Sequence, residues 1–298
     1  MTRVNMQRAL LIAGPTASGK TAYAIQRARA DDALIVNTDS MQVYDVLNVL
    51  TARPSAEELA QAEHKLFGHV PPAVRYSTGA WLDDVAPLVA DAAQSGRNLI
   101  FVGGTGLYFD ALINGFAQIP EIPQEVIQEV EAVIQPMDEG ERAAYIADKD
   151  PKMAARLQSP DPQRVARAIS VMEATNRSLA DWQDDDNAPS LIEGWDVEKI
   201  VLNPERELLR NRIAKRFELM MEGAAMEEVK AIKALDLDPS LPAMRAIGVP
   251  ELMAVMVGEM SLEEATEKAI TATRQYAKRQ RTWFRNRMAD WRWVDPFA

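Results

Sequence analysis

The octapeptide Gly14–Thr21 constrains this chain more than any other segment. It matches the phosphate-loop pattern G-x-x-x-x-G-K-[ST] at every fixed position, and it stands between the apolar run Ala9–Ala13 and the helical segment Ala22–Ala30. In that context the glycines let successive backbone N–H groups face phosphate oxygens, and the helix N-terminus adds positive charge. We therefore predict a binding site for a di- or triphosphate. The residues expected to line it are Gly14, Pro15, Thr16, Ala17, Ser18, Gly19, Lys20 and Thr21.

Two side chains of this loop have expected chemical roles. Lys20 supplies a positive charge to the outer phosphate, and the Thr21 hydroxyl is expected to ligate Mg²⁺. The loop by itself does not distinguish among kinases, nucleotide hydrolases, GTP switches and transferases, because one fold hosts many functions. The pattern Asn-Lys-x-Asp, which reads guanine in GTP switches, does not occur in the sequence.

Short apolar runs alternate with helical patterns through the first hundred residues. Further strands are predicted at Leu34–Asn37 and Asn98–Val102, with a helix over Ser77–Gln94 between them. This alternation is typical of an α/β fold with a parallel sheet, and ligands in such sheets bind beyond the carboxyl ends of the strands. We predict a phosphate-loop parallel sheet flanked by helices.

The pattern changes after Gly115. Residues 120–190 contain seven prolines, separated by helical patterns. We expect a helical insertion domain at residues 116–194, inserted into a catalytic α/β core formed by residues 1–115 and 195–298. A chain of this length can bury enough apolar surface for both parts to fold without disulfides, and it contains no cysteine.

The core is expected to resume with a strand and then long helices. The strand is predicted at Val197–Asn203, and the helices at Pro204–Met221, Met226–Leu235 and Leu262 to about Met288. The acidic stretch Asp181–Asn187, which precedes the strand, is expected to be a loop.

Two further loops follow predicted strands, so their side chains should meet the phosphate loop at one edge of the sheet. Asp39 follows the second strand, where a carboxylate could act as a general base, assist Mg²⁺ or merely cap a helix. Thr105 follows the third strand in a glycine-rich turn, which is a common feature without any ligand.

Three motifs stand at these loops: Gly-Pro-Thr-Ala-Ser-Gly-Lys-Thr at Gly14–Thr21, Asp-Ser-x-Gln-x-Tyr at Asp39–Tyr44, and Gly-Gly-Thr-Gly-Leu-Tyr at Gly103–Tyr108. Together they resemble the signatures of the tRNA dimethylallyltransferase family, also called tRNA isopentenyl transferases. The resemblance continues at later segments and covers nearly the whole chain. These segments are Thr51–Pro54, Asp161–Ala168 and Thr273–Trp283.

The resemblance implies transfer of a dimethylallyl group from its diphosphate to the exocyclic amine of the adenosine on the 3′ side of the anticodon. The phosphate loop would then hold dimethylallyl diphosphate rather than ATP. The amine must lose a proton as the new bond forms, so Asp39 would be the base, while Lys20 and Mg²⁺ would stabilise the leaving diphosphate. Arg212 and Arg216 lie four residues apart on a predicted helix, and we expect Arg216 to reach the diphosphate.

The resemblance also implies contacts with the anticodon stem-loop of tRNA. It assigns them to Asp39, Ser40, Met41, Gln42 and Thr105, and to Gln163, Arg164, Val165, Ala166 and Arg167. The second group starts a helix that Asp161 should cap and Pro162 should open. A solvated helix face is the alternative reading of that group.

A basic helix is expected near the end of the sequence. Six cationic and no acidic residues fall within Arg274–Arg287, although the whole chain carries a net charge of −11. We predict that this segment binds tRNA through Arg274, Lys278 and Arg281, with Trp283 and Phe284 in or near the core. The protein should therefore bind tRNA through a confined basic patch and bind bulk nucleic acid poorly.

The alternative function is that of a phosphate-loop kinase for a small molecule, in which Asp39 would activate the acceptor. No run of about 18 apolar residues and no signal-peptide pattern occurs, so we expect a cytoplasmic protein without a membrane partner. We also expect a monomer. The two histidines, His64 and His69, are interpreted as structural or RNA-facing rather than as metal ligands.

Overall fold

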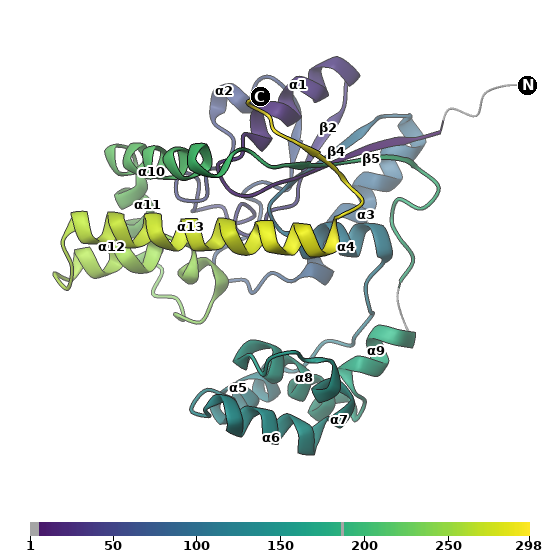
Figure 1. The fold of residues 1–298 in the computed structure, drawn as a ribbon, viewed down its shortest axis with the longest axis vertical. Helices are drawn as coiled ribbons and strands as arrows, with labels where there is room; N and C mark the ends of the chain where they lie inside the picture. The colour runs from purple at the N-terminus through teal and green to yellow at the C-terminus, as the bar shows by residue number, and fades with distance from the viewer. Residues whose placement is uncertain (1–5, 186–187) are drawn as a thin grey trace, which may run out of the picture. The chain divides into compact units, whose positions relative to one another are not determined.

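The computed structural model describes residues 6–185 and 188–298 (Figure 1). It divides the chain into two compact units: residues 1–113 with Leu191–Ala298, and Asn114–Ser190. The second unit begins and ends a few residues earlier than the segment 116–194 expected from the sequence. The second unit ends before Leu191 because Leu191 and Ile192 pack into the core of the first unit.

The first unit is built on a six-stranded parallel sheet of order β3-β2-β4-β1-β5-β6, which confirms the predicted fold class. The strands are β1 (Arg8–Ala13), β2 (Leu34–Asn37), β3 (His64–Lys65), β4 (Leu99–Gly103), β5 (Asp196–Leu202) and β6 (Arg292–Val294). The two edge strands, β3 and β6, are too short to produce a periodic pattern, and the sequence did not predict them.

Helices cover both faces of this sheet, which explains why its central strands are apolar throughout. Along β1, Ala9, Leu11 and Ala13 point into one core cluster, whereas Leu10 and Ile12 point into another. The first cluster is closed by α3 (Thr78–Ser95), α4 (Gly106–Asn114) and α13 (Leu262–Arg287), and the second by α1 (Lys20–Asp31).

A separate helical layer packs beside the sheet. In Figure 1, α10 (Arg206–Glu222) runs alongside α13, and these two helices contact each other in the structure. Smaller elements complete the unit: α2 (Ala56–Leu59), α11 (Ala225–Lys233), the 3₁₀ helix η1 (Pro242–Arg245) and α12 (Val249–Met256). In the described part of the chain, no helix is both long and apolar enough to cross a membrane.

The second unit is helical. Its described elements are α5 (Gln124–Ile134), α6 (Glu139–Lys149), α7 (Pro151–Arg156), α8 (Pro162–Thr175) and α9 (Leu179–Asp185). The expectation of a loop at Asp181–Asn187 is wrong for residues 181–185. They form a helix because Leu179 and Ala180 are buried and the acidic side chains pair with Lys152, Arg156 and Arg177. Residues 186–187 lie outside the described residues.

Candidate active site

The phosphate loop lies between β1 and α1, as its pattern predicts. Ala17 and Gly19 both adopt positive φ angles, 63° and 84°, so the backbone wraps around a central point before the helix begins at Lys20. The Ser18 N–H donates to the Pro15 carbonyl at 3.3 Å and closes the turn. Such a loop directs several N–H groups and the positive end of α1 toward one position.

Lys20 is partly buried and borders a cavity. It donates to the Pro15 carbonyl at 2.8 Å. Burial lowers its pKa from 10.5 to about 8, with Asp39 opposing the shift and Arg216 adding to it. A charged ammonium is therefore held in surroundings that disfavour charge, and an anion beside it would favour the charged form.

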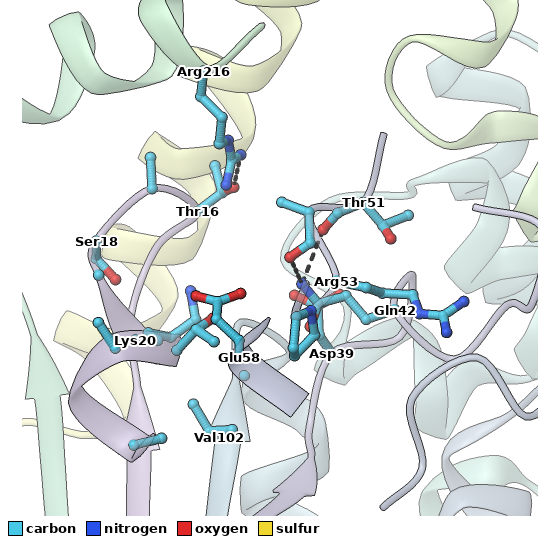
Figure 2. Close-up of a pocket in the computed structure, with 18 of the residues that line it drawn as sticks. Thr16, Ser18, Lys20, Asp39, Gln42, Thr51, Arg53, Glu58, Val102 and Arg216 are labelled. Carbon is cyan, nitrogen blue, oxygen red and sulfur yellow. Dashed lines mark hydrogen bonds between the residues drawn. The ribbon is translucent and has the colours of Figure 1, made fainter. Parts of the chain in front are cut away.

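Two arginines of α10 contact the same loop. The Arg216 guanidinium donates to the Thr16 hydroxyl (Figure 2), and Arg212 Nε donates to the Ala17 carbonyl at 3.0 Å. Burial lowers the pKa of Arg216 to about 10; Asp39 opposes this shift and Arg212 contributes to it. The four-residue spacing thus brings both side chains to the loop, and both line the cavity.

The loop after β2 holds Asp39 rigidly. Asn37 is completely buried; its side-chain NH₂ donates to the carbonyls of Asp39 and Leu66 at 3.0 and 2.9 Å, and its Oδ1 accepts the Asp39 N–H at 2.8 Å. Asp39 Oδ1 accepts the Met41 N–H at 3.0 Å. One carboxylate oxygen therefore maintains the turn, and Asp39 lines the same cavity as Lys20.

Neighbouring side chains connect the loops after β2 and β4. The Thr105 hydroxyl accepts the Ser40 N–H at 2.9 Å and donates to the Ser40 hydroxyl at 3.2 Å. Gln42 donates to the carbonyls of Thr51 and Ala52 at 2.9 and 2.8 Å, as Figure 2 shows. The structure thus brings the Asp39–Gln42 segment and Thr105 together, as the strand order requires.

The cavity has a volume of about 440 Å³ and is lined by charged and by apolar residues. The charged and polar residues include the phosphate loop with its cations. The apolar residues are Ala24, Ile35, Phe67, Val102 and Leu219. Within the described residues, the Ser18 hydroxyl is buried without a hydrogen-bond partner at the loop. The cavity therefore offers both charged and apolar contacts to a ligand.

Sequence reasoning did not assign several residues to this site, among them His64 and Gln280. His64 lines the cavity; its Nδ1 lies 2.8 Å from the Ala62 carbonyl, and burial lowers its pKa, which favours a neutral ring. Gln280 of α13 accepts a hydrogen bond from the phosphate loop. Gln280 falls in the family-like segment Thr273–Trp283, but that likeness does not say what its side chain contacts; the packing of distant elements decides this.

Magnesium is compatible with this cavity. Mg²⁺ sites at phosphates use one or two protein ligands, with the remaining positions taken by phosphate oxygens and water. Thr21 and Asp39 both line the cavity. Across residues 6–185 and 188–298, no cluster of three or more His, Cys, Asp or Glu side chains could hold a metal alone.

The residues of the second unit that are predicted to contact tRNA fall into two groups, one exposed and one buried. Gln163, Arg164 and Arg167 are exposed on α8, and Asp161 caps the helix by accepting the N–H groups of residues 163 and 164 at 3.1 Å. Val165 and Ala166, however, are 0% and 8% exposed. Their side chains fill the core of their unit, and their assignment to tRNA binding stays a prediction.

The basic helix α13 presents cations on one side and apolar groups on the other. Lys278 is exposed, whereas Arg274 and Arg281 are half-buried. Phe284 is completely buried, and Trp283 packs against the same core, as predicted.

Comparisons with known proteins agree with this geometry. The family model described as "IPP transferase" matches residues 42–287, and that described as "Isopentenyl transferase" matches residues 7–67. The tRNA dimethylallyltransferase of Chelativorans sp. is 52% identical, with 96% of this chain and 98% of the relative covered. The tRNA dimethylallyltransferase of Rhizobium johnstonii is 50% identical, with 95% of each chain covered.

Solved structures show the same likeness. The full-length tRNA isopentenylpyrophosphate transferase of Bacillus halodurans is 30% identical and superposes with a TM-score of 0.68, with 97% of this chain and 90% of that chain covered. A eukaryotic dimethylallyltransferase solved acting on tRNA superposes with a TM-score of 0.80 at 24% identity. The superposition covers 97% of this chain and 74% of that chain, and it supports the fold. The chain therefore belongs to the IPP transferase family.

Proposed function

We propose that this protein transfers a dimethylallyl group from dimethylallyl diphosphate to the exocyclic amine of the adenosine 3′-adjacent to the anticodon of tRNA, and releases diphosphate. The observation that carries the proposal is a single cavity lined by a phosphate loop, a carboxylate and apolar residues. A kinase shares the loop but does not require the apolar residues. Relatives of about half identity are named tRNA dimethylallyltransferases, which also disfavours the kinase alternative.

In the proposed reaction, the bond between the dimethylallyl carbon and the diphosphate oxygen breaks, and its electron pair leaves with the diphosphate. The amine nitrogen forms the new bond to that carbon, and its proton passes to Asp39. The loop N–H groups, Lys20 and Arg216 stabilise the negative charge that grows on the leaving group. Mg²⁺, held by phosphate oxygens and Thr21, would supply further charge stabilisation.

Recognition of tRNA is proposed to involve the exposed cations of two elements, each described on its own. On α8 these are Arg164 and Arg167, beside Gln163; on α13 it is Lys278, together with the half-buried Arg274 and Arg281. Phosphate contacts of this kind confer affinity that depends on salt. We further propose that the protein acts in the cytoplasm as a monomer.

The test is an incubation with dimethylallyl diphosphate, Mg²⁺ and tRNA from cells that lack this modification, followed by mass spectrometry of the nucleosides. Prenylated adenosine is expected. Asp39→Asn preserves an oxygen for the Met41 N–H and removes the base, so kcat should fall about 10²- to 10⁴-fold with the fold intact. An unmodified tRNA, or phosphorylation of a metabolite by ATP, would contradict the proposal.

A further inference from the structure

Gln280 connects two loops that lie far apart in the sequence. It stands on the inner side of α13 and is only 6% exposed. Its Oε1 accepts the N–H of Thr16 at 3.0 Å, and its Nε2 donates to the carbonyl of Gly104 at 3.0 Å. Both ends of one amide are therefore used, one on the phosphate loop and the other on the loop after β4.

Each of these loops lies next to one of the two groups that the proposed reaction needs, the diphosphate site or the base Asp39. Thr16 belongs to the phosphate loop, and its hydroxyl accepts a hydrogen bond from Arg216. Gly104 lies beneath Asp39: a Cβ atom at position 104 would stand 3.2 Å from Asp39 Oδ2 and 2.2 Å from Gln280 Nε2. The Gln280 amide therefore joins the phosphate loop to a loop residue that lies next to Asp39.

We propose that Gln280 is a positioning residue, which sets the spacing between the leaving diphosphate and Asp39; this inference rests on the proposed function. Alkyl transfer requires the amine, the attacked carbon and the leaving oxygen to be aligned. A misplacement of about 1 Å can cost about 10²-fold in rate. A side-chain amide suits the role because it accepts from one loop and donates to the other, and no side chain lacking a donor can do both.

The experiment compares Gln280→Met and Gln280→Glu with the natural protein. Methionine keeps nearly the same length and removes both hydrogen bonds, whereas an ionised glutamate keeps an acceptor for Thr16 and loses the donor to Gly104. Gln275→Met is the matched control, since Gln275 is exposed on the same helix. The measurements are kcat, KM for each substrate, the directly measured Kd of dimethylallyl diphosphate, and the melting temperature.

The expected result is a loss in kcat of about 10²-fold for Gln280→Met and a clear loss for Gln280→Glu, with KM and Kd within about threefold of the natural values. The control should match the natural protein. Gly104→Ala approaches the contact from the opposite loop, where its Cβ would push the amide away. Its Cβ would also stand 3.2 Å from Asp39 Oδ2, so a loss of kcat is expected from either contact, and an unchanged kcat overturns the inference even where a Gln280 variant does not fold.

Two outcomes overturn the inference. One is an unchanged kcat in folded Gln280 and Gly104 variants. The other is a loss of kcat that only parallels a loss of donor affinity or of melting temperature, which a purely structural residue would produce. Failure of the natural protein to prenylate tRNA would instead overturn the proposed function, so the two failures are distinguishable.

Discussion

Replacing Lys20 by Met should stabilise the fold while it abolishes binding of the donor. Lowering the pKa of this partly buried ammonium from 10.5 to about 8 corresponds to a charging cost of about 3 kcal/mol at neutral pH. Methionine fills a similar volume without charge, but it loses the hydrogen bond to the Pro15 carbonyl, worth about 1 kcal/mol. The free energy of unfolding should therefore rise by about 2 kcal/mol at pH 7 without ligand.

The pH dependence of this gain identifies its cause. Because the pKa of Lys20 is lower in the folded state, the unfolded state binds more protons between pH 8 and 10.5, and the natural protein gains stability as pH rises through that window. Lys20→Met lacks this titration, so its advantage should disappear by about pH 10. All other groups titrate in both proteins, so the difference between the two free energies of unfolding reports on Lys20 alone.

Urea denaturation at pH 7 and pH 10 measures both free energies, and titration with dimethylallyl diphosphate measures the loss of binding. Lys268→Met is the matched control, because Lys268 is exposed on α13 and its replacement should change stability by less than about 0.5 kcal/mol. A variant less stable than the natural protein at pH 7, or a gain that persists unchanged at pH 10, would refute the reasoning.

Three other changes have expected outcomes. Arg216→Gln removes a charged partner of Thr16, so steady-state kinetics should show KM for the donor raised about 10-fold or more with tRNA affinity unchanged. Gly106→Ala places a Cβ 2.2 Å from the Trp283 ring and should cost about 1–3 kcal/mol in thermal unfolding, whereas Gly79→Ala in α3 makes only an ordinary contact, 3.7 Å from Ser77 Oγ, and should not destabilise. Fluorescence titrations over a range of salt should show weaker tRNA binding and a flatter salt dependence when three cations are replaced by glutamine. These are Arg274, Lys278 and Arg281.

The conformation of the loop Gly14–Thr21 was predictable from sequence because that conformation restricts the residues that can form it. Gly19 has a positive φ and precedes a helix, and a lysine follows it in the pattern that phosphate binding requires. Asp39 was predictable as well, since strand ends in a parallel sheet lie at one edge. Its role could be proposed only because the motif around it resembles that of a family.

Residues positioned by tertiary packing could not be predicted in this way. Gln280 stands in a polar and basic stretch of α13, and only the packing of that helix under two loops buries its amide. Val165 and Ala166 show a related limit: the segment Asp161–Ala168 is contiguous in sequence, but successive residues of a helix point in different directions. Part of this segment therefore fills the core of its unit, while Gln163, Arg164 and Arg167 are exposed.

The charge of the whole chain and the charge of the cavity have opposite signs, and the structure shows why both are possible. Five cationic side chains line the cavity, against the two carboxylates of Asp39 and Glu58, whereas the chain carries a net charge of −11. Screening in physiological salt limits the reach of exposed charges to about 8 Å, so acidic surfaces elsewhere do not neutralise this local excess. Burial lowers the pKa values of Lys20 and Arg216, which means that the protein alone pairs these cations incompletely. A diphosphate, with several negative charges, would pair with these cations. The favourable free energy of that pairing would contribute to its selective binding.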